Sequence, residues 1–283
     1  MWLNNDNCDS EMVSGGFKAV MKKVSLDQLV SSFVSLKSIF LLICLSMGNQ
    51  AANAFTMKMT KTEFETLSFE CKAIYSITRT GRNDGFGDFL PANQRETWRL
   101  IGEKYGGAWH YCGGLIYFRR AEISIKKWEK EKNYDKAARE MAFSFGRMKK
   151  KPGDKTSWAP MMATDIARAR RKLGETEEAI KMLNSALRYN PKYLEAHVEY
   201  GLLHYHNGRF ENAKASFMKA NELAGGASSQ IIYFLGLASL ELGEIEEAKK
   251  YELEAAKKGY PLKGLKNKIE VYEQAELAKQ TKN

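Results

Sequence analysis

The C-terminal half of this chain repeats one pattern at a spacing of about 34 residues. Each copy has a glycine followed five positions later by an alanine: Gly174 and Ala179, Gly208 and Ala213, Gly243 and Ala248. A fixed period of this length is typical of stacked helix–turn–helix units. One such unit cannot bury its apolar face alone, so each packs on its neighbours and the array presents an extended surface. The period therefore predicts a scaffold that holds another chain.

A second small residue lies 12 positions before each alanine, at Ala167, Gly201 and Gly236. Alanine or glycine at such a position lets two antiparallel helices approach to the low end of the usual separation of about 8–10 Å. The glycine between the two helices predicts a left-handed cap that ends the first helix.

These repeats resemble the tetratricopeptide family, whose signature is W-x2-L-G-x2-Y, then A-x3-F, then P. The matching positions are Ala163, Ile166, Ala167, Arg170, Ala179, Leu183 and Pro191 in the first copy, His197, Tyr200, Gly201, His204, Ala213 and Phe217 in the second, and Ile232, Leu235, Gly236, Ser239 and Ala248 in the third. Glu252 stands where a large apolar residue is expected, and Pro261 falls one place late. The resemblance covers roughly residues 158–261. It implies an all-α solenoid of three stacked repeats, with a helical N-terminal extension and a C-terminal capping helix.

A divergent unit is predicted upstream, at residues 106–157. Trp109, Cys112 and Gly113 fit the start of the signature, and the segment around Ala137 is similar to the one around Ala213. Gly113 and Ala137 are 24 positions apart, compared with 12 for the corresponding pair in each repeat, so this unit holds 12 extra residues. We interpret them as a first helix extended by about three turns, through Trp128. The alternative is an unrelated helical hairpin.

Residues 21–54 have the organisation of a secretory signal peptide. A basic start at Met21-Lys22-Lys23 precedes the apolar segment 39–47, and Ala52-Asn53-Ala54 forms a small-x-small cleavage site. We expect cleavage after Ala54, a periplasmic mature chain and no stable membrane span after cleavage. Residues 1–20 then precede the true start. A retained membrane anchor is the alternative.

Export changes the interpretation of the cysteines. Cleavage leaves Cys71 and Cys112, an even pair in an oxidising compartment. We predict a disulfide between them, which would pin a helix around Cys71 to the divergent unit; two buried thiols are the alternative. No C-x-x-C pair occurs, which excludes a thioredoxin-like site.

Charge is distributed unevenly. Residues 55–172 hold 25 Lys and Arg against 14 Asp and Glu, whereas residues 173–283 hold 15 against 16. The densest part, residues 147–172, predicts a patch for an anionic partner such as an acidic protein, a glycan or lipid headgroups. A solvated basic face is the alternative, and an exported chain is not expected to meet nucleic acid.

The sequence shows little chemistry of the kind that enzymes use. No H-E-x-x-H, G-x-S-x-G or Walker loop occurs, and we expect neither a metal nor a cofactor. His197 and His204 occupy signature columns and are expected to pack between helices, while His206 points elsewhere. Within the extension at residues 55–105, the glycine-rich segment 81–93 predicts a surface loop, with a ligand loop as the alternative.

The resemblance also places a partner-binding groove. In the family, residues beside the signature columns of each first helix contact the ligand. By resemblance these are Met161, Thr164, Arg168, Arg171 and Lys172 in the first repeat, Glu195, Val198, Leu202, Tyr205 and His206 in the second, and Gln230, Tyr233, Leu237 and Leu240 in the third. The alternative is a groove that is empty or filled by the chain's own tail.

The sequence leaves two functions of different class. The first is a periplasmic scaffold that binds a protein or peptide in this groove, in the assembly of a cell-envelope complex. The second is an enzyme, or the recognition subunit of one, acting on envelope polymer through the N-terminal module. The tail, residues 262–283, has apolar residues near helical spacing at Leu265, Ile269, Tyr272 and Leu277 and predicts a helix that caps the array. A free docking helix is the alternative.

Overall fold

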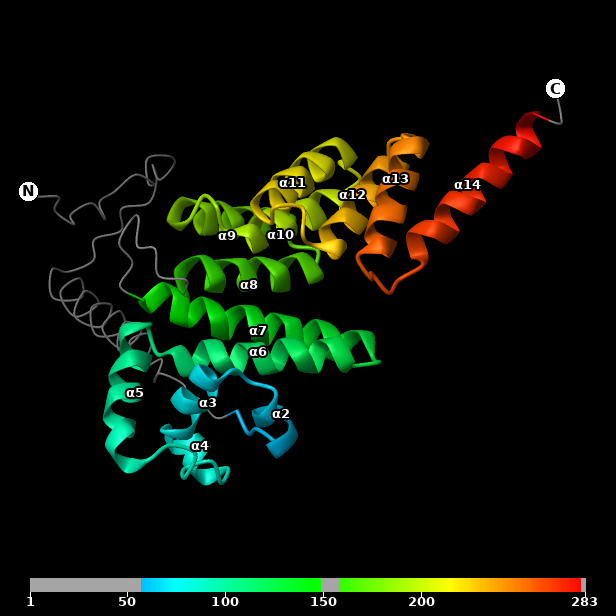
Figure 1. Ribbon diagram of the computed structural model, residues 1–283. Helices are drawn as coiled ribbons and strands as arrows, with labels where there is room; N and C mark the ends of the chain where they lie inside the picture. The colour runs from blue at the N-terminus through cyan, green and yellow to red at the C-terminus, as the bar shows by residue number, and fades with distance from the viewer. Residues whose placement is uncertain (1–56, 149–157, 281–283) are drawn as a thin grey trace, which may run out of the picture. The chain divides into compact units, whose positions relative to one another are not determined.

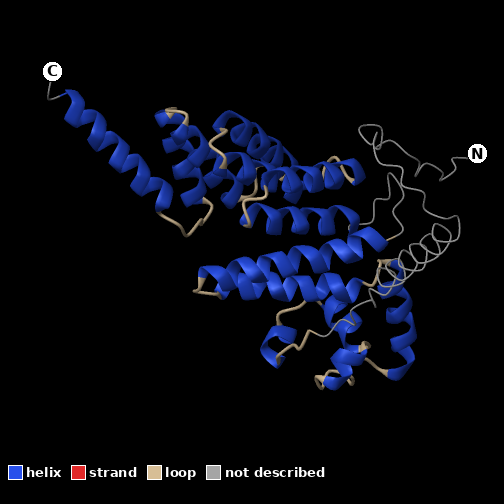
Figure 2. Ribbon diagram, turned by 180° about the vertical axis from the view of Figure 1, so that it is seen from behind, coloured by secondary structure: helices blue, strands red, loops and turns tan. Residues whose placement is uncertain are grey.

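The computed structural model describes residues 57–148 and 158–280, which form helices and no strand (Figures 1 and 2). The predicted all-α fold is confirmed. The predicted signal peptide and Lys149-Lys150-Lys151 lie outside the described residues. The helices are α2 (Lys61–Glu65), α3 (Phe69–Ser76), α4 (Arg79–Asn83), α5 (Ala92–Lys104), α6 (Ala108–Ile123), α7 (Lys127–Arg147), α8 (Trp158–Lys172), α9 (Thr176–Tyr189), α10 (Leu194–His206), α11 (Phe210–Leu223), α12 (Ser229–Glu241), α13 (Ile245–Lys257) and α14 (Gly264–Gln280).

The three repeats are the helix pairs α8–α9, α10–α11 and α12–α13, which follow one another in space (Figure 1). The glycine after each first helix is left-handed, with φ of 78° at Gly174, 68° at Gly208 and 76° at Gly243. This is the predicted cap, and it is needed because a residue with a side chain strains in that backbone region.

Two of the small residues permit the close helix approach that the spacing predicts. A Cβ atom added to Gly201 would lie 2.3 Å from the ring of Phe217. One added to Gly236 would lie 2.4 Å from Leu265 of α14 and 3.1 Å from Tyr251. Glycine at these positions therefore sets how tightly each first helix packs on the helices that come after it in the chain.

The upstream unit is a helical hairpin of α6 and α7, and one detail of its prediction is wrong. Trp128 begins the second helix rather than ending the first, because the turn lies at residues 124–126. The extra length is shared: α6 runs ten residues past Gly113, compared with five past Gly201 in α10, and α7 starts ten residues before Ala137, compared with three before Ala213 in α11. The glycine that meets the second helix is Gly114, where a Cβ would lie 2.6 Å from Met141.

The predicted surface loop at residues 81–93 consists of turns between two helices, and part of it is packed into the protein. Its ends belong to α4 and α5, and a Cβ on Gly81 would lie 2.1 Å from the carbonyl oxygen of Tyr75. The ring of Phe86 stacks on Phe64 with 4.0 Å between centroids. The Asp84 carboxylate accepts hydrogen bonds from the Met59 amide at 2.9 Å and the Tyr75 hydroxyl at 2.8 Å. This segment is part of the core of the N-terminal extension, and deleting it would remove core side chains.

Helix α14 covers the end of the array. Leu265 and Ile269 are buried against α12 and α13, in a cluster with Tyr233 and Leu240. Lys268 bonds Glu241 of α12 at 2.9 Å, and Lys249 of α13 bonds Glu273 at 2.7 Å. The predicted cap is therefore present, but Leu277 is 61% exposed, and the last turns of α14 extend beyond α13 in both views (Figures 1 and 2).

Candidate functional site

The predicted groove residues of the first repeat are largely engaged within the chain. Thr164 is buried, and its hydroxyl donates to the Pro160 carbonyl at 2.8 Å, while Met161 packs half-buried against the core. Arg168 and Arg171 both reach across to Glu199 of α10, at 2.6 Å and 3.0 Å. This part of the groove is thus closed by contacts between the first two repeats.

Glu199 is the residue that the sequence analysis missed. It is 3% exposed and is held between two guanidinium groups, because a buried carboxylate is costly unless it is paired. Burial alone would lower the pKa of Arg168, but Glu199 and Asp165 outweigh burial and raise it. A glutamate on the polar side of a helix carries no sequence signal of burial, so only the packing of α8 on α10 could reveal it.

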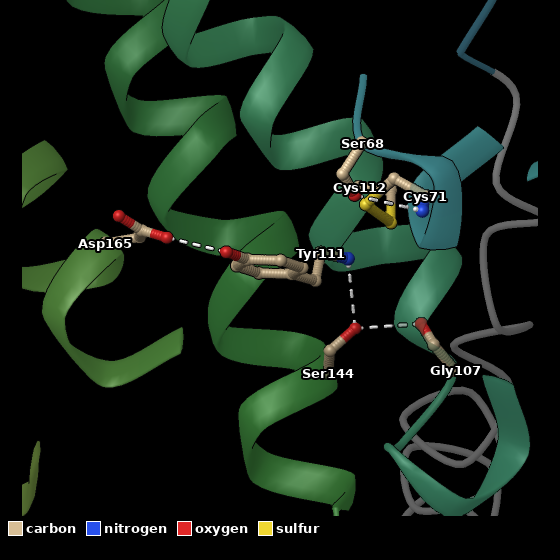
Figure 3. Close-up of a disulfide and its surroundings, with 7 residues drawn as sticks. All are labelled: Ser68, Cys71, Gly107, Tyr111, Cys112, Ser144 and Asp165. Carbon is tan, nitrogen blue, oxygen red and sulfur yellow. Dashed lines mark hydrogen bonds between the residues drawn. A yellow bond between two sulfur atoms is a disulfide. The ribbon is translucent and has the colours of Figure 1, made fainter. Parts of the chain in front are cut away.

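The same network continues into the upstream hairpin. Arg168 bonds Asp165 at 2.9 Å, and the Tyr111 hydroxyl of α6 donates to Asp165 at 2.6 Å (Figure 3). Burial raises the pKa of the Asp165 carboxyl above its ordinary value, against the opposing effect of Arg168. Ser144 of α7 accepts from the Tyr111 amide and donates to the Gly107 carbonyl, which fixes this turn of α6 (Figure 3). The charges bind the hairpin to the array.

The other described cations of the basic segment 147–172 also have partners. Lys172 bonds Glu122 of α6 at 3.0 Å, and Arg170 bonds Glu175 at 2.6 Å. The guanidinium of Arg147 lies 5.3 Å from the ring centroid of Phe143. An anionic ligand at this segment would have to compete with these internal contacts.

The second repeat keeps more of its predicted surface. Val198, Leu202 and Tyr205 are half-buried beside the cluster that α10, α11 and α12 share, and Glu195 and His206 are exposed. The Tyr205 hydroxyl donates to Glu241 of α12 at 2.8 Å. This bond joins the first helix of the second repeat to the first helix of the third. Although His206 is exposed overall, partial desolvation of its imidazole, with Arg171 and Lys172 nearby, lowers the pKa of His206 below its ordinary value.

The third repeat divides its predicted residues into two groups. Tyr233 and Leu240 are 8% exposed and lie in the cluster with α14, so the cap removes them from any ligand surface. Gln230 is exposed and Leu237 is half-buried. We call the residues that remain accessible the A-face strip: Glu195, Val198, Leu202, Tyr205, His206, Gln230 and Leu237.

The histidines of α10 have structural surroundings. The ring of His204 stacks on Tyr200 with 5.7 Å between centroids, and burial lowers its pKa. His197 Nε2 lies 2.9 Å from the Pro191 carbonyl. Over the described ranges, no three metal-ligating side chains come together.

The structure also joins Cys71 of α3 to Cys112 of α6 by a disulfide, with Cα atoms 5.4 Å apart (Figure 3). The bond holds the N-terminal extension to the hairpin, as the sequence predicts. The structure also has an open depression of about 730 Å³. None of its lining residues belongs to the A-face strip, and all of them belong to α9: Glu177, Glu178, Ile180, Lys181, Asn184, Ser185 and Arg188. No helix in the described part of the chain is both long and apolar enough to cross a membrane.

Comparison with known proteins identifies the repeats in part of the chain. The tetratricopeptide-repeat family matches residues 164–227, which run from within α8 to the end of the second repeat. These residues carry tetratricopeptide repeats. The third pair, α12–α13, lies beyond the match and continues the array with the same capping glycine.

Two solved structures are similar to the chain. One, described as the crystal structure of MamA, is 18% identical with a TM-score of 0.44, covering 63% of this chain and 92% of that one. Another, described as the crystal structure of MamA protein, is 22% identical with a TM-score of 0.44, covering 67% and 92%. At this level of likeness nothing about function can be inferred. The comparison with curated proteins found no match.

Proposed function

We propose that this chain is a non-catalytic periplasmic scaffold that holds a protein or peptide partner in the assembly of a cell-envelope complex. Tetratricopeptide repeats of this kind bind protein partners. The observation that carries the proposal is the A-face strip, which stays accessible on the second and third repeats while ion pairs and the cap close the surface on either side.

The chemistry of the strip limits the partner. Val198, Leu202 and Leu237 offer apolar contacts, and Glu195 adds an exposed carboxylate beside them. Apolar anchors with a charged edge suit a short segment whose apolar side chains recur at helical spacing. We therefore expect a peptide with apolar anchors and a basic residue near Glu195. The described cations of residues 147–172 are engaged within the chain, so this proposal includes no anionic partner there.

The periplasmic location rests on the segment 39–47 and the cleavage site at Ala52-Asn53-Ala54. The mature chain should begin at Phe55, and N-terminal sequencing of the protein from a periplasmic fraction checks this. Recovery of the full-length chain from washed membranes would instead identify a retained anchor.

The binding surface can be tested by photocrosslinking in cells. A photoreactive residue at exposed Gln230 should trap one specific partner, to be identified by mass spectrometry. The matched control places the same group at Met218 of α11, which is 54% exposed and lies on the second helix of its repeat, whereas the strip residues lie on first helices. The same adducts at both positions, or none at Gln230, would contradict the proposal.

A further inference from the structure

The turn between α6 and α7 exposes a compact group of large apolar side chains. Ile123 is 75% exposed, Ile125 is 99% exposed and Trp128 is 60% exposed. Single exposed apolar residues are ordinary, but three within six positions at one turn form a patch that needs an explanation. We call residues 123–128 the hairpin tip.

The corresponding turns of the array have a different character. They are Leu173-Gly174-Glu175, Asn207-Gly208-Arg209 and Leu242-Gly243-Glu244. Each uses a left-handed glycine, and both leucines are half-buried rather than exposed. The hairpin tip has Ser124-Ile125-Lys126 instead, and the Ser124 hydroxyl donates to the Arg120 carbonyl at 2.7 Å. The tip is thus a fixed turn that presents Ile125 to solvent.

The hairpin also reaches further than its neighbours. The added residues lengthen α6 by five and the start of α7 by seven relative to the second repeat, which is about 7–10 Å at 1.5 Å per residue. In both views the tip projects past the end of α8 (Figures 1 and 2). A projecting apolar turn is convex and forms no groove in which a peptide could lie. It is better suited to insertion into a deformable surface such as a lipid bilayer.

The charges around the hairpin tip indicate what kind of surface it would bind. Four lysines, Lys126, Lys127, Lys130 and Lys132, lie between Ile125 and Tyr134 against two glutamates, Glu129 and Glu131. Lys127 is 90% exposed although it lies 3.9 Å from Glu131, and Lys132 lies 5.9 Å from the centroid of the Trp128 ring. Tryptophan with isoleucine and flanking lysines is the composition that anchors protein surfaces at the interface of anionic bilayers.

We propose that the hairpin tip inserts Ile123, Ile125 and Trp128 into the headgroup region of an anionic lipid bilayer, with the four lysines contacting the lipid phosphates. The chain would then rest on a membrane surface through the hairpin while the A-face strip stays free. This inference is independent of the partner that the strip binds.

Vesicle flotation tests the proposal. The probes are vesicles of phosphatidylcholine and phosphatidylglycerol at a 7:3 ratio, and vesicles of phosphatidylcholine alone. The full chain and a form beginning at Phe55 are compared, which separates any contribution of the apolar segment 39–47. The test variant is Ile125→Ser with Trp128→Ser, and the matched control is Met218→Ser with Leu253→Ser, both 54% exposed in the array.

For the form beginning at Phe55 we expect binding to the anionic vesicles, weakened by salt and reduced at least about tenfold by the tip variant but not by the control. The tryptophan emission should shift to the blue on binding, and Trp128→Phe should remove that shift while keeping most of the binding. Circular dichroism and melting temperature confirm that both double variants are folded.

Three outcomes would overturn the proposal. One is equal vesicle binding by the tip variant and the wild type. Another is no binding to anionic vesicles by the form beginning at Phe55. The third is concentration-dependent self-association that only the tip variant loses, which would make the tip an interface between two copies.

Discussion

At the scale of single residues, small side chains decide how closely the helices pack. Gly201 and Gly236 each lie where an added Cβ would overlap a neighbour, whereas Gly146 of α7 has nothing within 4 Å of that position. Packing therefore requires glycine at positions 201 and 236, whereas Gly146 contributes no close contact and only weakens its helix.

The first prediction compares these glycines. Gly201→Ala should lower the free energy of unfolding by about 1–3 kcal/mol, because its methyl group overlaps the Phe217 ring. Gly146→Ala should raise it by up to about 1 kcal/mol, because alanine is the better helix former and the space is open. Urea unfolding followed by circular dichroism measures both. A neutral Gly201→Ala would show that the two helices can separate at little cost.

The second prediction concerns pH. Arg120 donates to the Glu63 carboxylate at 2.6 Å and lowers the pKa of Glu63 to about 2. A carboxylate with a depressed pKa stabilises the fold above its unfolded pKa, and that contribution is lost as pH falls from about 4.5 toward 2. Because the pair is partly exposed, we expect it to be worth about 1 kcal/mol.

Glu63→Gln should therefore lower the melting temperature near pH 6 and flatten its decline between pH 4.5 and 2. The control is Glu211→Gln at an exposed site on α11. Parallel pH profiles for the wild type and Glu63→Gln would contradict the predicted linkage.

At the scale of elements, the two ends of the described unit are held by different means. The N-terminal helices are joined to α6 by a disulfide and by the ion pair between Glu63 and Arg120, and the last repeat is covered by α14. Short helices such as α2 and α4, of five residues each, depend on these contacts because isolated helices of that length are unstable.

The third prediction tests the disulfide. Cys71→Ser with Cys112→Ser should lower the free energy of unfolding by about 2–4 kcal/mol, because the bond closes a loop across a sequence separation of 41 residues. Limited proteolysis should then cut first within residues 57–105. Peptide mapping without reductant provides the control, since the wild type should give one linked pair. Free thiols at both positions would contradict the bond.

The fourth prediction separates the two halves of α14. Truncation after Pro261 exposes Tyr233 and Leu240, and should cost at least about 3 kcal/mol and promote aggregation. Truncation after Gln274 removes only the exposed end with Leu277 and should leave the melting temperature nearly unchanged. If both truncations were equally harmless, α14 would be a docking helix rather than a cap.

At the scale of the whole described unit, one core runs from Met57 to Leu203 and joins the extension, the hairpin and the first repeat. The ring of Trp158, at the start of α8, stacks on Tyr105 with 4.7 Å between centroids, and Asp165 bonds Tyr111. The hydrophobic core of the first repeat is therefore continuous with that of the upstream helices.

The fifth prediction rests on that continuity. A chain that begins at Trp158 keeps all three repeats but loses the hairpin that covers α8, so it should melt at a lower temperature and aggregate. The form that begins at Phe55 should unfold in one transition, with tryptophan fluorescence and circular dichroism coinciding. Two separate transitions would show that the array folds independently of the hairpin.

The sequence by itself determined the array. The period of about 34 residues located three helix pairs, the capping glycines and the covering helix, because each depends on residues close together in the chain. The sequence also showed that the upstream hairpin holds 12 extra residues. It did not show where the first helix ends and the second begins, so it misplaced the turn. The sequence pattern put Trp128 in the wrong helix because both helices of the hairpin are longer than those of the second repeat.

Only the tertiary structure decided what remains accessible. Arg168 and Arg171 look like free cations in the sequence, yet they bind Glu199 about 30 residues away, and Tyr233 and Leu240 look like ligand positions but lie under α14. The segment 81–93 has the composition of a surface loop, yet Phe86 and Asp84 complete a core. In each case the partner comes from a distant part of the chain, and hydrophobic periodicity carries no information about which charged or aromatic groups meet when helices stack.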